Sequence, residues 1–463
     1  MIIKIKGVEI DLEKIGINFT PNIEQIQALN HLAEFMASDK LTTVLSGSAG
    51  TGKSSLMRIF LEYDRLTTKS NVRLVAPTHK AKAVLSRLSK NGNVTTLHKL
   101  LGLKPDFNIF EFDARAMRFL ESLNLIMFET HKDLLIVDEG SMVNDPLYDM
   151  LIKKMAKKGK IIFLGDIKQL APVKQGSSSK VFHGTDYPGF TLTIVERQHD
   201  NPLLDTLVKL RDGKEIVYES DTIAGKGLRV HKMRDFQIAL SESFYSLEDL
   251  NKVPQGNKIL AYTNVRVAGF NQLVRKLMGC NGKVFNDGEL LMAYDSYSRS
   301  YEEVLQNGSD YMIISAPKVD KLIPSYGLFP GYNITLKDIH TGEISKVFML
   351  DPEADDKHYK NLAIVLEGAR LKGVKRKYLF KNYFAITESF VTMKDLIYDN
   401  RVIRTKTLDY GYACTVHKSQ GSSYTNVFVD IDNVNICRDV NERRQLEYVA
   451  LSRPTHLAHI LKK

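Results

Sequence analysis

Short β-rich runs alternate with helical runs in the first part of this 463-residue chain, and this alternation constrains the fold more than any other feature. LTTVLSG is followed by the helical pattern KSSLMRIFLEYDRL, NVRLVAPT by HKAKAVLSRLSK, LLIVDE by a polar helix, and KIIFLGD by a turn. Parallel strands need a crossover, which is usually a helix, whereas antiparallel strands can be joined by a tight turn. We therefore predict an α/β fold built on a parallel sheet.

Changes in this rhythm predict the domain organisation. A helix is expected over 21–38, with Thr20 as its N-cap and Pro21 at its first position. Alternating aromatic residues after a Lys-Pro-Asp turn predict a hairpin insert, and a Gly-, Tyr-, Val- and Ile-rich stretch predicts a small all-β domain. The predicted segments are 1–97 and 129–200 for the first α/β domain, 98–128 for the hairpin, 201–285 and 405–463 for a second α/β domain, and 286–404 for the β insert.

Charge and cysteine content limit the partners and the compartment. The formal net charge of +10 favours a polyanionic partner, although a solubilising basic surface is the alternative. Three widely spaced cysteines, Cys280, Cys414 and Cys437, with no CxxC or Cys/His cluster, indicate neither a disulfide framework nor a structural zinc site. With no signal peptide and no run of about 18 apolar residues, we expect a soluble, cytoplasmic protein without a membrane partner.

The segment GSAGTGKSS, which follows the first β-rich run, predicts a phosphate-binding loop. It matches the pattern GxxxxGK[ST], in which backbone N–H groups and the following helix N-terminus bind phosphate. Lys53 is expected to reach the β- and γ-phosphates, and Ser54 to bind Mg²⁺. A plain glycine turn is the alternative, which the flanking strand and helix patterns disfavour. The candidate nucleotide-binding residues here are Gly47, Ser48, Ala49, Gly50, Thr51, Gly52, Lys53, Ser54 and Ser55.

Two acidic residues end the run LLIVDE and complete a hydrolytic site. Asp138 is expected to hold Mg²⁺, and Glu139 to orient and deprotonate the attacking water. Gln169, in IIFLGDIKQLAPV, is available to contact the γ-phosphate. Arg197, in TIVERQ, is by itself more typical of a surface ion pair. An NTP hydrolase is therefore expected, rather than an NTP-binding scaffold.

Taken in order, the motifs resemble the superfamily 1 helicases of the RecD/Dda-like branch. They are NIEQIQA, the phosphate loop, APTHKAKAVL, TTLHKLLG, IVDEGSM, GDIKQLAPV, TIVERQ, AYTN, TVHKSQGSS and YVALSRP. The resemblance implies two RecA-like motor domains, with a hairpin insert in the first and a β-barrel-like insert in the second. It also implies ATP and Mg²⁺ as ligands and adenine binding by Gln25. Arg453 is implied as an arginine finger, and Arg197 as a γ-phosphate contact.

The same resemblance implies a DNA path and a polarity. From this branch we expect an enzyme that translocates on single-stranded DNA from 5′ to 3′ and unwinds duplexes at junctions. We also expect a monomer, with partners in replication or recombination. Backbone contacts of this kind carry no base code. The implied DNA-binding residues are Pro77, Thr78, His79, His98, Asn264, His417 and Ser419, and the implied strand-separating wedge is Phe107, Phe110 and Phe112.

Several alternatives stay open at this point. The segment TVHKSQGSS is also compatible with a solvated loop, and the three phenylalanines with a small core of the insert. An RNA or RNA–DNA hybrid helicase would use similar backbone contacts. An ATP-driven translocase or switch would not need the wedge, and a small-molecule kinase would not need His417 and Arg453. Gly140 departs from the apolar residue that relatives commonly have after the acidic pair.

Overall fold

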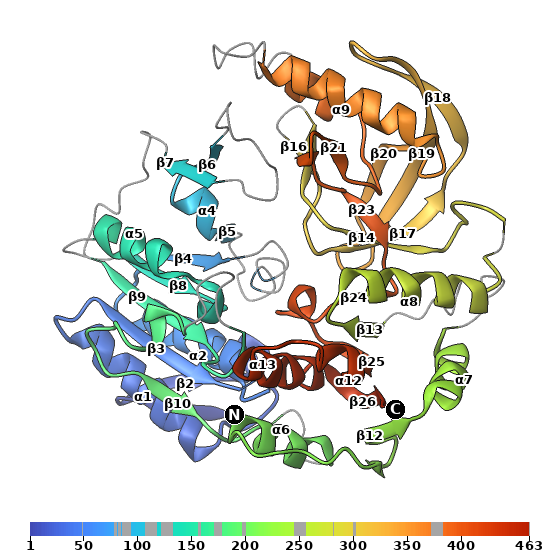
Figure 1. The fold of residues 1–463 in the computed structure, drawn as a ribbon. Coiled ribbons are helices and arrows are strands. Elements are labelled where there is room, and N and C mark those ends of the chain that lie inside the picture. Colours follow the sequence, from blue (N-terminus) through green and yellow to red (C-terminus); the bar gives the residue numbers. More distant parts are fainter. Residues whose placement is uncertain are drawn as a thin grey trace. The chain divides into compact units, whose positions relative to one another are not determined.

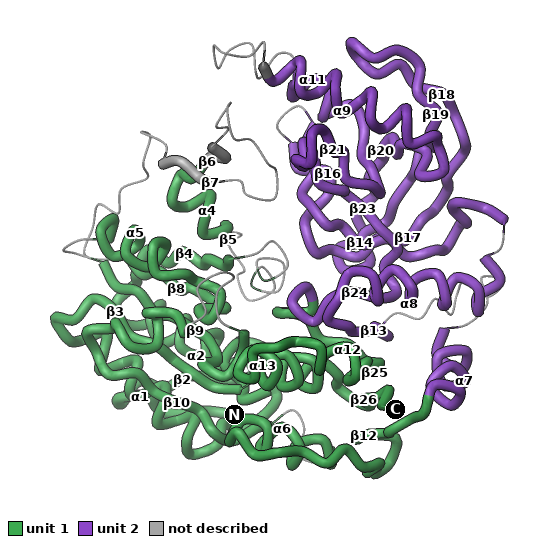
Figure 2. Tube along the Cα trace, in the orientation of Figure 1, with its two compact units in different colours: residues 1–103, 121–232, 419–463 green, residues 104–120, 233–418 purple. Residues whose placement is uncertain are grey.

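A computed structural model gives the fold of most of the chain (Figure 1). Two compact units are described separately below. The first comprises residues 1–103, 121–232 and 419–463, and the second comprises residues 104–120 and 233–418 (Figure 2). Their limits cut across the predicted domain boundaries, which stay a prediction. The structure describes all residues except 49, 78–80, 82–84, 86–93, 107–117, 122–132, 156–158, 171–177, 197–200, 245–255, 281, 300–301, 372–382 and 463.

The chain begins with a hairpin and a capped helix. Strands β1 (Ile2–Ile5) and β2 (Val8–Asp11) pair antiparallel, a 3₁₀ turn follows at Glu13–Ile15, and helix α1 spans Ile23–Ala37. The N-cap of α1 is Asn22, so the prediction of Thr20 is wrong. Asn22 and Gln25 form a capping box in which each side chain accepts a hydrogen bond from the other residue's backbone N–H. This reciprocal pair satisfies two free amides, which a threonine two residues earlier does not reach.

A six-stranded, fully parallel sheet forms the centre of the first unit, as the strand–helix alternation predicted. Its order is β10-β3-β9-β8-β4-β5. The strands are β3 (Thr42–Gly47), β4 (Asn71–Ala76), β5 (Val94–Thr96), β8 (Asp133–Val137), β9 (Lys160–Gly165) and β10 (Phe190–Leu192).

Helices cover both faces of this sheet, because successive strand residues point to opposite sides. Leu45 packs in one core with α1 and α2 (Lys53–Leu66), whereas Val44 packs in another with α5 (Asp145–Met155). Buried on both faces, the strands read as continuous apolar runs. Helix α4 (Leu97–Leu100) follows β5. Strands β6 (Leu103–Asp106) and β7 (Arg118–Glu121) form a separate two-stranded sheet. Two 3₁₀ turns lie at Gly140–Met142 and Lys180–Phe182.

Further α/β elements are divided between the two units. The first unit holds α6 (Leu203–Arg211), β11 (Asp221–Ile223), β12 (Lys226–His231), β25 (Tyr424–Asp430), α12 (Ile431–Val434), α13 (Val440–Leu451) and β26 (Pro454–Leu461). In it, β26 pairs in parallel with both β12 and β25. The second unit holds α7 (Met233–Ser243), β13 (Asn257–Ala261), α8 (Asn264–Leu277) and β24 (Ala413–Thr415). A 3₁₀ turn at His417–Ser419 follows, and its last residue, Ser419, begins the final segment of the first unit.

An antiparallel sheet dominates the rest of the second unit, in the order β18-β19-β17-β14-β23, with β20 also paired to β19. Its strands are β14 (Leu290–Ala293), β17 (Asp310–Ser315), β18 (Lys318–Ile323), β19 (Gly327–Asp338), β20 (Ile344–Leu350) and β23 (Leu408–Tyr410). Two hairpins accompany it: β15 (Tyr297–Arg299) with β16 (Glu302–Leu305), and β21 (Leu396–Tyr398) with β22 (Arg401–Arg404).

The expectation of an all-β insert is wrong at one element, the helix α9 (Asp356–Leu371), which a short helix α11 (Ala385–Thr387) follows. Leu362 and Leu366, four residues apart on α9, are buried in one core with Phe329 and Phe348 of the sheet. This spacing is helical and places an apolar stripe on the sheet. Within the described residues, no helix has the length and hydrophobicity needed to cross a membrane.

Candidate active site

The phosphate loop connects the buried strand β3 to helix α2, as predicted. Gly50 and Gly52 have φ of +89° and +87°, which residues with a Cβ rarely adopt. At Gly52 a Cβ would also lie 2.7 Å from Gln25 Nε2, which is closer than such atoms approach. Both the backbone conformation and the close neighbour therefore require glycine at position 52.

Two neighbouring segments hold this loop from outside. The side chain of Gln25, only 1% exposed, donates from Nε2 to the carbonyl of Thr51 at 3.1 Å and accepts from the Asn22 amide at 3.0 Å. The backbone N–H of Glu196 donates to the carbonyl of Gly50 at 3.0 Å. Gln25 thus links the start of α1 to the loop, while its predicted contact with adenine stays a prediction.

Lys53 is the first residue of α2, and its ammonium lies within the loop. It donates to the carbonyl of Gly47 and, at 3.0 Å, to that of Ser48. Ser54 and Ser55 follow in the first turn of α2 and are half-buried. The positive charge, the free amides of the helix start and the hydroxyl groups together suit a polyphosphate with a bound cation.

The acidic pair lies at the carboxyl end of β8. Asp138 donates its backbone N–H to the carbonyl of Val75, and Asp138 Oδ1 accepts from the Glu139 amide at 2.9 Å. Glu139 has a left-handed backbone with φ of +51°. At Gly140, the departure noted in the sequence, a Cβ would lie 2.9 Å from Val181 Cγ1. Tight packing behind the acidic pair explains the glycine.

Burial and nearby charges shift both acids. Burial raises the pKa of Asp138, and burial together with the charge of Asp138 raises the pKa of Glu139 to about 7. The positive charges of Arg453 and Lys53 act in the opposite direction on the pKa of Glu139. A carboxyl group with a pKa close to neutral is suited to accept a proton from water.

Arg453 directly follows the cap of helix α13 and is only 4% exposed. Its guanidinium donates to the carbonyl of Val449 at 3.0 Å and to the carbonyl of Ser422 at 3.2 Å. A Cβ on Gly421 would lie 3.6 Å from Glu139 Oε1, so the loop 419–423 lies beside the acidic pair. The C-terminal segments QGSS and LSRP therefore reach the same site as the phosphate loop, which lies in the N-terminal part of the chain.

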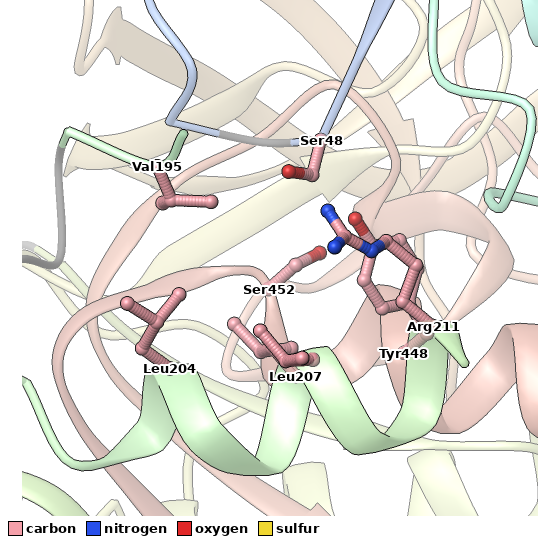
Figure 3. Close-up of a pocket in the computed structure, with 8 residues that line it drawn as sticks. Ser48, Val195, Leu204, Leu207, Arg211, Tyr448 and Ser452 are labelled. Carbon is pink, nitrogen blue, oxygen red and sulfur yellow. The ribbon is translucent and has the colours of Figure 1, made fainter. Parts of the chain in front are cut away.

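A small pocket lies beside the phosphate loop (Figure 3). Ser48 of the loop faces Tyr448 and Ser452 of the α13 segment across it. Leu207 and Arg211 come from α6, and the guanidinium of Arg211 points towards Ser48. Gln169 is buried in the turn after β9, where its backbone N–H donates to the carbonyl of Asp166 at 3.1 Å.

Buried polar atoms without partners gather at these segments. Of eight buried side-chain nitrogen or oxygen atoms that have no hydrogen-bond partner among the described residues, five belong to the site: Ser48 Oγ, Ser141 Oγ, Gln169 Oε1, Gln420 Nε2 and Ser422 Oγ. Such groups are rare in folded proteins because each costs about 1–3 kcal/mol. Their concentration here fits a site built for a polar ligand, such as a nucleotide with its cation and water.

Four of the predicted DNA-binding residues follow the carboxyl ends of parallel strands. In the first unit, Pro77 follows β4 and half-buried His98 lies in α4 after β5, and these strands are neighbours. In the second unit, exposed Asn264 begins α8 after β13, and half-buried His417 follows the paired strand β24. Ser419 is fully buried and has no surface for a ligand in this conformation.

Seven predicted site residues lie outside the described residues, and nothing in the structure bears on them. They are Ala49 of the phosphate loop, Thr78 and His79, Arg197, and the wedge residues Phe107, Phe110 and Phe112.

Comparisons with known proteins identify the family of the chain. A family model described as an AAA domain matches residues 20–232, and a UvrD-like helicase C-terminal domain matches residues 410–461. The ATP-dependent DNA helicase dda of Enterobacteria phage T4 is 26% identical over 458 residues, covering 93% of this chain and 96% of that protein. The RecBCD enzyme subunit RecD of Buchnera aphidicola subsp. Schizaphis graminum is 23% identical, covering 85% of this chain and 66% of that protein.

Solved structures extend the comparison to the fold. A Bacteroides Pif1 helicase in complex with ADP-AlF3 and ssDNA matches with a TM-score of 0.52 at 16% identity, covering 96% of this chain and 92% of that one. This likeness confirms the predicted architecture of two RecA-like motor domains. The ordered motifs, the two family models and the relatives agree, and the chain belongs to the superfamily 1 helicases, in the group that includes Dda, RecD and Pif1.

Proposed function

We propose that this chain, an ATP-dependent DNA helicase by its family, moves along single-stranded DNA from 5′ to 3′ and opens duplexes at junctions. The observation that best supports ATP hydrolysis is the concentration of unpartnered buried polar atoms at the phosphate loop, the acidic pair and the C-terminal motif segments. The similarity to a phage DNA helicase and to a Pif1 helicase in complex with ssDNA supports DNA as the track. We further propose that the enzyme acts as a monomer.

Each site residue has a role in this proposal. Lys53 and the loop amides bind the β- and γ-phosphates, and Ser54 with Asp138 holds Mg²⁺, which neutralises phosphate charge. Glu139 accepts a proton from the attacking water. Gln169 and Arg453 stabilise charge that develops on the transferring phosphoryl group. Arg197 acts in the same way, and Gln25 binds adenine.

Two sets of backbone contacts convert this chemistry into movement. We propose that Pro77, Thr78, His79 and His98 contact the strand from the first motor domain, and Asn264 and His417 from the second. Ser419, the third residue expected from the second domain, is fully buried and reaches the strand only after a change of conformation. ATP bound to both motor domains favours a closed state, and hydrolysis removes that bridge. The wedge of Phe107, Phe110 and Phe112 separates the strands at the junction. These contacts avoid base edges, so binding is expected to be independent of sequence.

The raised pKa of Glu139 predicts a pH dependence. The free enzyme needs Glu139 deprotonated, so kcat/KM for ATP is expected to fall as the pH drops through about 7. The measurement is kcat/KM against pH at saturating DNA. Asp149→Asn, an exposed carboxylate paired with Lys180, is the matched control and should leave the profile unchanged. A kcat/KM that stays constant from pH 8 down to about pH 5.5 would contradict a general base with this pKa.

Polarity and unwinding are tested together with tailed duplexes. Matched duplexes carrying a 5′ or a 3′ single-stranded tail are mixed with ATP and Mg²⁺, with Lys53→Ala as the inactive control. Wild type is expected to open only the 5′-tailed duplex, because this polarity accompanies the branch. Opening of only the 3′-tailed duplex would reject the polarity, and DNA-stimulated hydrolysis without any opening would reject the helicase in favour of a translocase.

A further inference from the structure

A buried hydrogen bond joins two segments of the site that are distant in the sequence. The hydroxyl of Tyr448, in α13, donates to Asp166 Oδ2 at 2.8 Å, across 282 residues of sequence. Both residues are 3% exposed. Burial raises the pKa of Tyr448, so the phenol stays protonated and keeps its proton for this bond. A hydrogen bond to a carboxylate in such surroundings is stronger than one between neutral groups.

Asp166 connects this bond to the turn that carries Gln169. Its other oxygen, Oδ1, accepts from the backbone N–H of Lys168 at 3.0 Å, and its carbonyl accepts from the Gln169 amide. The carboxylate therefore uses one oxygen to shape the turn after β9 and the other to hold α13. Its charge is also one of the influences that raise the pKa of Glu139.

Tyr448 connects the same bond to Arg453. It lies one helical turn before the cap Ser452, whose amide donates to the Tyr448 carbonyl at 3.0 Å. Arg453 in turn donates from Nε to the carbonyl of Val449. Figure 3 shows Tyr448 and Ser452 on one side of the pocket, facing Ser48 of the phosphate loop. A shift of Tyr448 would thus move the backbone that carries Arg453.

We propose that Tyr448 is a positioning residue for ATP hydrolysis, whose bond to Asp166 fixes α13 so that Arg453 stands beside Glu139. This inference rests on the proposed ATPase function. The bond acts between two segments rather than on the nucleotide, so it sets the rate of the chemical step and not the affinity for ATP. Misplacement of a catalytic group by about 1 Å can cost about a hundredfold in rate.

The chain offers a matched control, a second tyrosine that bonds to Glu447, the residue before Tyr448. The hydroxyl of Tyr218 donates to Glu447 Oε2 at 2.9 Å, so it too joins a tyrosine, here half-buried, to a carboxylate at α13. Glu447 is itself on the helix, and Tyr218 does not line the pocket beside the phosphate loop. Tyr218→Phe therefore removes the same kind of bond from α13 without touching the turn after β9.

The experiment measures DNA-stimulated ATP hydrolysis of Tyr448→Phe, Tyr218→Phe, Asp166→Ala and the double variant Tyr448→Phe/Asp166→Ala. We expect Tyr448→Phe to lower kcat by about tenfold to a hundredfold while KM for ATP changes by less than about twofold. Tyr218→Phe should keep kcat near the wild-type value. The double variant should lose no more than Asp166→Ala alone, because the two residues act through one bond.

Several results would overturn the inference. They are an unchanged kcat in Tyr448→Phe, an equal loss in Tyr218→Phe, or losses that add fully in the double variant. Thermal unfolding of both phenylalanine variants separates a general loss of stability from misplacement of Arg453. Wild type and Lys53→Ala are measured in the same assay. Failure of the proposed function would appear as equal turnover by these two proteins, and failure of the inference as a normal Tyr448→Phe beside an inactive Lys53→Ala.

Discussion

Arg453→Ala is expected to lower kcat for ATP hydrolysis by about 10³- to 10⁵-fold, the usual contribution of an arginine finger. The guanidinium is buried and stands close enough to Glu139 for its charge to oppose the rise in the pKa of that carboxyl. A fixed positive charge in a site with little water stabilises the transition state without reorganisation. Affinity for ATP should change much less, because Lys53 and the loop amides remain.

Single-turnover hydrolysis and binding of a fluorescent ATP analogue measure these two quantities separately. Arg444→Ala, an exposed arginine on the same helix, is the matched control and should behave as wild type. Arg453→Lys keeps the charge but not the forked geometry, so an intermediate rate is expected. If Arg453→Ala retains more than about a tenth of the wild-type kcat, Arg453 does not act on the transition state.

Glu139→Gln should abolish turnover, with a fall in kcat of about 10²- to 10⁴-fold, and still bind ATP. Glutamine has almost the same shape, so the loop backbone and the contact with Gly421 should persist. It cannot accept the proton of the attacking water. Because Gln carries no titrating group, any residual activity should also lose the dependence on pH near 7 that Glu139 imposes.

Equilibrium binding of ATP and single-turnover hydrolysis test this variant, and Glu215→Gln, at an exposed position, is its control. ATP-bound Glu139→Gln should hold single-stranded DNA stably, because without hydrolysis the enzyme stays in its ATP-bound state. Robust turnover by Glu139→Gln would show that another residue acts as the general base. Loss of ATP binding would instead give Glu139 a structural role in the site.

Local patterns predicted the parallel sheet, the phosphate loop and the acidic pair. A glycine-rich loop between a strand and a helix binds phosphate through its own backbone, and Asp138 and Glu139 end a strand whose neighbours are parallel. Local patterns were less reliable at element ends and in the insert. Asn22 caps α1 instead of Thr20, because the partner it needs is Gln25, and α9 was missed within a β-rich stretch.

The sequence patterns did not predict the contacts between distant segments. Gly140 stands where Val181 leaves no room for a side chain, and Asp166 meets a tyrosine in α13, at the other end of the chain. The bond that Gln25 makes to the phosphate loop is of the same kind. Each contact depends on how the sheet and helices pack, because packing decides which side chains come within bonding distance. A short sequence motif does not specify that distance.

The sequence by itself therefore determined the fold class and the family, and it located the loop that we propose binds phosphate, because these depend on short segments with their own backbone chemistry. Only the tertiary structure decided how Arg453 approaches Glu139, why the pKa of Glu139 rises, and which residue holds α13 in place. Burial and charge are properties of the assembled core, and they arise from atoms that the chain brings together only when it folds.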